Sequence, residues 1–141
     1  MKTIRKKVEE LLEKPYRVID ILPERVPEEA PGRYFAVERH YLEPARFTDI
    51  SKRFADIVIK LYFYYDLIVL LGDADEPLVD PGPEQLENLI ESAKQHMCIL
   101  IGNSSLLMIS TDDLYMTVFN ADDSLTARIE LLAKAKGLFV R

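Results

Sequence analysis

The chain has 141 residues, of which 48% are hydrophobic and 30% charged, and its formal net charge is −6 at pH 7. This length and composition predict one globular α+β domain over residues 1–141 and argue against intrinsic disorder. The negative charge opposes nucleic-acid binding, and the single cysteine cannot form an internal disulfide. The longest apolar run, residues 57–71, is shorter than the roughly 20 residues of a membrane-spanning helix. We therefore expect a soluble, cytoplasmic protein.

The first third of the chain predicts a helix followed by two strands. Apolar side chains recur at helical spacing within residues 2–14. Residues 16–22 and 34–41 alternate apolar and polar side chains, the pattern of half-buried strands. We expect these two strands to pair as a hairpin with an irregular connection, which places His40 on the polar face of the second strand.

The middle of the chain predicts helices around a short apolar segment. Helical spacing runs from about Phe47 to about Tyr65. Residues 67–71 are so short and so uniformly apolar that they fit either a buried strand or a last helical turn. Gly72 ends this segment in both cases. A further helix is expected to begin at Pro83, because proline suits the first helical turn.

The last third predicts a three-stranded meander and a closing helix. Gly102 and Asn103 both tolerate positive φ, as a two-residue hairpin turn requires. Asp122 or Asp123 is expected to cap the final helix, and Gly137 to end it in the left-handed conformation. The expected strands are 97–101, 106–109, 114–119 and a short edge strand at 138–140, with a turn at 111–113.

These elements predict an α+β fold with one antiparallel sheet of about five strands and helices packed on it. The expected order is helix, two strands, two helices, three strands and helix. This order resembles that of sensor and scaffold domains of the PAS, profilin and roadblock kinds. The resemblance concerns element order alone and implies no particular function.

The segment after residue 71 is strongly acidic. No Lys or Arg occurs between Lys60 and Lys94, whereas eight Asp and Glu residues do. Such a segment can seat a cation, face a basic partner or form a solvated loop that caps the next helix. The residues alone leave these three interpretations open.

The spacing of the first carboxylates supports the metal-binding interpretation. An apolar run leads into Asp73-Ala-Asp75, with Asp80 five residues further on, which resembles the motif of haloacid-dehalogenase-type phosphatases and the Asp-x-Asp of nucleotide-sugar transferases. The resemblance implies a Mg²⁺ site made of Asp73, Asp75 and Asp80. The chain departs from the phosphatase pattern because Glu76 and Pro77 replace its Gly-Thr.

The remaining reactive residue types form no recognisable catalytic set. His40, His96 and Cys98 are too few and too widely spaced to predict a zinc site. Cys98 lies within an apolar strand and is expected to act as a small buried hydrophobic residue. Ser104 and Ser105 follow a turn and lack the strand-to-helix elbow of a nucleophilic serine.

The run Tyr62-Phe-Tyr-Tyr65 completes the candidate site, because adjacent aromatic side chains point in several directions and at least one can reach a partner. We predict a non-catalytic interaction, inhibitor or regulatory module that binds another protein or a second copy. The alternatives are a Mg²⁺-dependent phosphate-handling enzyme and a small-ligand sensor with an apolar cavity behind the meander. The predicted partner-binding residues are Asp73, Asp75, Glu76, Asp80, Tyr64 and Tyr65.

Overall fold

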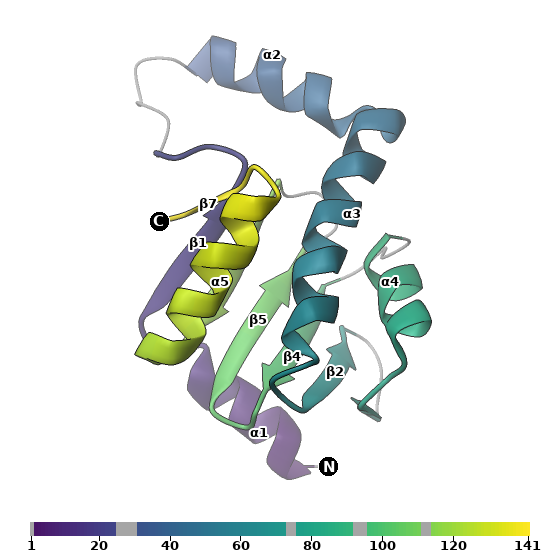
Figure 1. Ribbon diagram of the computed structural model, residues 1–141, viewed down its shortest axis with the longest axis vertical. Coiled ribbons are helices and arrows are strands. Elements are labelled where there is room, and N and C mark those ends of the chain that lie inside the picture. Colours follow the sequence, from purple (N-terminus) through teal and green to yellow (C-terminus); the bar gives the residue numbers. More distant parts are fainter. Residues whose placement is uncertain (1, 25–30, 73–75, 92–95, 111–113) are drawn as a thin grey trace.

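The computed structural model describes residues 2–24, 31–72, 76–91, 96–110 and 114–141. Within these ranges the chain forms a seven-stranded antiparallel sheet and five helices (Figure 1). The strands are β1 (Tyr16–Asp20), β2 (Leu67–Leu71), β3 (Leu78–Val79), β4 (Met97–Ile101), β5 (Ser105–Ile109), β6 (Tyr115–Phe119) and β7 (Phe139–Val140). The helices are α1 (Lys2–Leu11), α2 (Pro31–Leu42), α3 (Pro44–Leu61), α4 (Pro83–Glu91) and α5 (Asp123–Ala135).

The sheet is built around the local meander β4-β5-β6. Its strand order is β3-β2-β4-β5-β6-β1-β7, so strands from the two ends of the chain pair at one side. Every pairing is antiparallel. The α+β class and the single antiparallel sheet predicted from the sequence are confirmed, but the sheet has seven strands where about five were expected.

Local turn and cap chemistry gives the C-terminal third its predicted form. Gly102 and Asn103 have the expected positive φ values, 57° and 67°. The predicted two-residue turn is wrong in its length, because Ile101 pairs with Ser105 and residues 102–104 form a three-residue loop. The side chain of Asp122 accepts a hydrogen bond from the Leu125 backbone N–H and caps α5. Gly137, with φ of 71°, follows the end of α5 in the left-handed conformation. The predicted turn at 111–113 lies outside the described residues.

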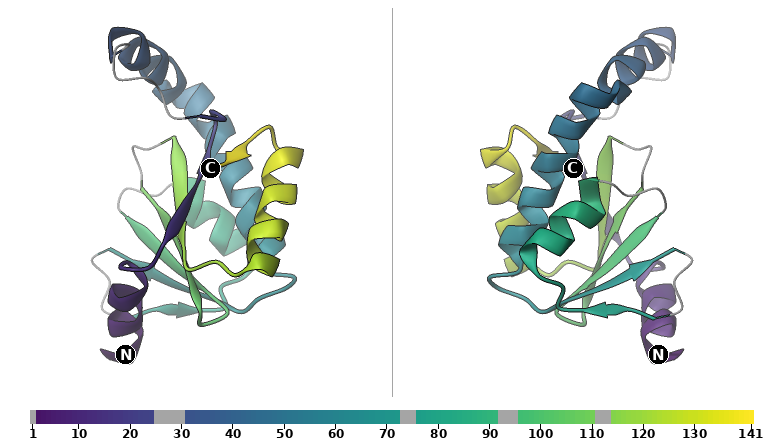
Figure 2. Two further views of the ribbon diagram at one scale, coloured as in Figure 1. Left: turned by 90° about the vertical axis from the view of Figure 1, so that its left-hand side faces the viewer. Right: turned by 90° about the vertical axis from the view of Figure 1, so that its right-hand side faces the viewer.

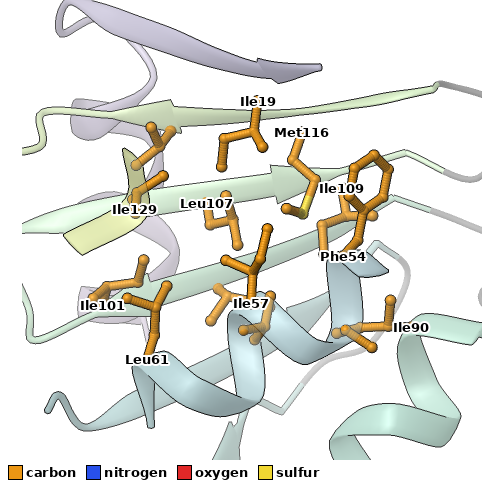
Figure 3. Packing of buried hydrophobic residues seen from close by; sticks show 14 of the residues in the cluster. Ile19, Phe54, Ile57, Leu61, Ile90, Ile101, Leu107, Ile109, Met116 and Ile129 are labelled. Atoms are coloured by element: carbon orange, nitrogen blue, oxygen red, sulfur yellow. The ribbon is translucent and has the colours of Figure 1, made fainter. Parts of the chain in front are cut away.

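The hydrophobic core lies between the sheet and helices α3, α4 and α5, which cover one face (Figures 1 and 2). Ile57 and Leu61 of α3 point into it, against Leu107 and Ile101 of the sheet (Figure 3). A second, smaller cluster lies on the opposite face under α1 (Figure 2). The buried residues of this second cluster are Val8, Leu11, Leu70, Leu100 and Leu106. No helix of the described ranges is long and apolar enough to cross a membrane.

The prediction of a strand at residues 34–41, and of a hairpin with β1, is wrong. This segment lies in α2, and β1 pairs instead with β6 and β7. Pro31 suits a first helical turn, and the basic Arg39 and His40 in the last turn suit the negative end of the helix dipole. The apolar side chains of this segment form no buried face, because Phe35 and Val37 are 60% and 51% exposed. His40 therefore lies on a helix and not on a strand.

The α3 boundary also differs from the prediction. The helix begins at Pro44 and ends at Leu61, four residues before the expected end at Tyr65. Residues 67–71 form strand β2, which resolves the ambiguity left by their short apolar pattern. The helix predicted from Pro83 is α4, and the edge strand predicted at 138–140 is β7. Because α2 replaces a predicted strand and the strands β2 and β3 lie between α3 and α4, the element order differs from the one that resembled PAS, profilin and roadblock domains.

Candidate functional site

The candidate site is the turn that joins α3 to β2. Backbone N–H groups of Tyr64 and Tyr65 both donate to the Leu61 carbonyl, at 3.0 Å each, and tighten the chain directly after the helix. The Asp66 carbonyl accepts a hydrogen bond of 2.9 Å from the Gly102 N–H, which ties the turn to the β4-β5 hairpin. The turn is thus held at both sides by regular structure.

Helix α5 lies beside α3 (Figure 1). It carries Arg128, whose side chain reaches this turn. The Arg128 Nη1 atom donates to the Tyr65 hydroxyl at 2.7 Å. The guanidinium carbon lies over the Tyr64 ring at 4.5 Å from its centroid and over the Tyr65 ring at 5.5 Å. Both ring distances suit a cation–π interaction. We call Tyr64, Tyr65 and Arg128 the Tyr–Arg cluster.

The cluster reaches solvent through the aromatic side chains of the turn. Tyr64 is 59% exposed and the adjacent Phe63 is 84% exposed, whereas Tyr65 and Arg128 are half-buried. Tyrosine and arginine are enriched among the residues that dominate protein–protein binding energies. An exposed aromatic pair beside an arginine that is already held in place is therefore suited to docking a protein.

Asp80 lies at the same end of the sheet as the cluster. Its Oδ1 atom accepts from the Leu67 N–H at 3.0 Å, and its own N–H donates to the Leu67 carbonyl. Partial burial, together with the negative charges of Asp80 and Asp66, raises the pKa of the nearby Tyr62 hydroxyl. Asp80 thus both anchors the chain after β3 and adds negative charge beside the turn.

The other predicted acidic residues are placed differently. Glu76 is exposed and precedes β3, and Gly72, the last described residue before the acidic segment, lies at the opposite end of β2 from Leu67. Asp73 and Asp75 lie outside the described residues. Within the described ranges, no group of three His, Cys, Asp or Glu side chains could hold a metal ion.

The histidine, cysteine and serine side chains have local structural partners. His40 makes an edge-on ring contact with Tyr41 on α2. The His96 Nδ1 atom lies 2.8 Å from the Ser110 Oγ across strands β4 and β5, in an exposed position. Burial raises the pKa of the half-buried Cys98 thiol, with a smaller opposing effect of Arg5, so the thiolate is disfavoured.

An open pocket of about 360 Å³ lies between α5 and β7. Its position differs from the enclosed cavity behind the meander that the sensor alternative predicts. The residues around it are Glu130, Lys134, Gly137, Leu138, Phe139 and Val140.

Sequence reasoning included Phe63 in the candidate aromatic run but named only Tyr64 and Tyr65 as partner-binding residues, and it missed Arg128. The sequence separation of 63 between Tyr65 and Arg128 explains the omission of Arg128, because no local pattern links them. Phe63 is flanked by tyrosines, and its exposure follows from the end of α3 at Leu61, before the aromatic run.

Comparisons with known proteins give no relative: no protein-family model, curated protein or solved structure matches this chain.

Proposed function

We propose that this protein is a non-catalytic binding module that docks a partner protein through the Tyr–Arg cluster and the adjacent Phe63. The observation that supports this most directly is the Tyr65–Arg128 hydrogen bond beside the exposed Tyr64 ring. Large, rigid side chains held before binding lose little conformational entropy when a partner arrives. An inhibitor or a regulatory subunit would use such a surface.

The acidic residues add a charged element to the proposal. Asp80 lies at this end of the sheet, whereas the segment with Asp73, Asp75 and Glu76 follows the opposite end of β2 and is proposed to attract basic side chains of the partner from outside the Tyr–Arg cluster. Peripheral charges of this kind mainly accelerate association and weaken in salt. Changing Asp73, Asp75 and Glu76 to Asn, Asn and Gln should slow association at low salt and have less effect at high salt.

A matched pair of exposed phenylalanines provides the control. Phe35 on α2 is 60% exposed and Phe63 is 84% exposed. Helix α3 has 18 residues and so spans about 27 Å, and α2 lies at its start while Phe63 follows its end (Figure 1). Alanine at either position removes an exposed ring of the same kind, but only Phe63 belongs to the proposed surface.

The test is a selection of displayed random peptides on the immobilised protein, followed by calorimetry with the enriched peptides. We expect Tyr64→Ala and Phe63→Ala to weaken peptide binding by about tenfold or more, as loss of a dominant interface residue does. Phe35→Ala should bind as the unchanged protein does. Peptides that bind equally to all variants, or that lose binding only with Phe35→Ala, would contradict the proposed surface.

A further inference from the structure

Arg128 differs from the other well-placed arginines in its partners. Arg46, Arg53 and Arg141 each form an ion pair with an aspartate or glutamate. Among the described residues, no carboxylate pairs with Arg128, whose Nη1 is used by the neutral Tyr65 hydroxyl. A half-buried guanidinium in a chain with 24 acidic residues is thus left without an anionic partner within the described ranges.

The edge of this guanidinium formed by Nε and Nη2 can donate two further hydrogen bonds. With Nη1 donating to Tyr65, the Nε and Nη2 atoms have no acceptor among the described residues. These two atoms carry parallel N–H groups, whose spacing matches the two oxygens of a carboxylate. The hydrogen bond to Tyr65 and the cation–π contact with Tyr64 both restrain the guanidinium, so a bidentate ion pair can form with little further ordering.

We propose that the partner presents an aspartate or glutamate side chain to the Nε–Nη2 edge of Arg128, with an adjacent apolar side chain packed on Phe63. This inference rests on the proposed function and names the group that the Tyr–Arg cluster recognises. Exposed Phe63 lies next to Tyr64 in the turn and supplies the apolar contact.

A carboxylate fits this position better than a phosphate group. Sites for phosphorylated segments usually gather several arginines around the dianion. Here a single guanidinium lies near a turn that contains Asp66. The turn is also close to Asp80, and the negative charges of both aspartates help to raise the pKa of Tyr62. A dianion would meet more repulsion from these carboxylates than a monoanion, with one cation to offset it.

The test uses three small ligands that share a phenyl ring and differ in the polar group attached to it: 3-phenylpropanoate, its neutral amide and phenyl phosphate, whose linker is shorter. Titration of the ¹⁵N-labelled protein is followed at the Arg128 side-chain Nε–H resonance and at the backbone N–H resonances of Tyr64 and Tyr65, which are present in every Arg128 variant. We expect 3-phenylpropanoate to shift these resonances with a Kd on the order of millimolar, which corresponds to a binding free energy of about −4 kcal/mol. The amide should bind at least about tenfold more weakly, because it cannot form the charge-assisted pair.

Two variants separate charge from geometry. Arg128→Gln removes the charge and should abolish the response, whereas Arg128→Lys keeps the charge without parallel donors and should bind several-fold more weakly. Circular dichroism and thermal melting verify that both variants are folded. Binding unchanged in Arg128→Gln, equal binding in Arg128→Lys, or phenyl phosphate bound tenfold more tightly than 3-phenylpropanoate would each overturn the proposal.

The peptide selection distinguishes this inference from the proposed function. Enriched peptides with Asp or Glu beside an apolar residue, and loss of their binding in Arg128→Gln, support both. A different outcome would refute the carboxylate inference and leave the proposed function standing. In that outcome the enriched peptides depend on Tyr64, share no acidic position and bind without Arg128. If 3-phenylpropanoate binds at Arg128 but no peptide depends on Phe63 or Tyr64, the proposed function fails instead.

Discussion

The Tyr65–Arg128 hydrogen bond can be measured as a coupling free energy in the unbound protein. Tyr65→Phe removes the hydroxyl acceptor at 2.7 Å and keeps the ring, while Arg128→Met removes the donor and keeps much of the side-chain length. A hydrogen bond to a charged donor contributes about 1.5–3 kcal/mol when buried, and exposed charged pairs about 0.2–1 kcal/mol. Both residues are half-buried, so we expect a coupling of about 1 kcal/mol.

The assay is a double-mutant cycle in urea, with the free energy of unfolding measured for the four proteins by circular dichroism. Tyr64→Phe with Arg128→Met is the matched control, because Tyr64 contacts Arg128 through its ring and no hydrogen bond of its hydroxyl to Arg128 is present. This control should give a coupling below about 0.3 kcal/mol. A Tyr65 coupling as small as that of Tyr64 would refute a cluster that is held in place before binding.

Three further predictions concern the fold that supports the site. Leu107→Ala, at a fully buried position of the central strand, should destabilise the protein by about 3 kcal/mol in urea unfolding, and a loss below about 1 kcal/mol would contradict the core packing. Asp122→Ala removes the α5 cap and should cost about 1 kcal/mol, measured in the same way; an unchanged midpoint would argue against the cap. Burial raises the pKa of Asp56, but the ion pairs with Lys136 and Lys60 outweigh it and hold the folded-state pKa below the ordinary 3.8. Asp56 therefore stabilises the fold at pH 7 and loses this effect as the pH falls below 3.8 through the lowered pKa. Asp56→Asn should be less stable than the unchanged protein at pH 7, and the difference should shrink as the pH falls below 3.8; a difference that stays constant there would contradict this.

Local sequence patterns predicted the turns and helix ends that are determined by neighbouring residues. The hairpin at Gly102 and Asn103 could be predicted because positive φ at two successive residues restricts the turn type and its sequence. The cap at Asp122 and the left-handed Gly137 are of the same kind. Each depends on residues within a few positions of one another, so the sequence contains the whole cause.

The errors arose where the cause lies elsewhere in the chain. Phe35 and its neighbours alternate as a strand does, but a strand needs a free sheet edge, and β1 is already paired on both sides. Period-two and helical patterns are hard to separate when the apolar side chains stay exposed. In the same way, the aromatic turn could be identified as a candidate from the sequence, while Arg128 could not, because only the packing of α5 beside α3 brings it there.

The position of β1 between β6 and β7 has a consequence for biosynthesis. Residues 16–20 leave the ribosome well before their strand partners at 115–119 and 139–140 are translated. Until then this segment has neither neighbour to satisfy its backbone groups. A nascent chain stalled after α4 should therefore be far more prone to proteolysis within residues 16–20 than a chain that includes β6 and β7.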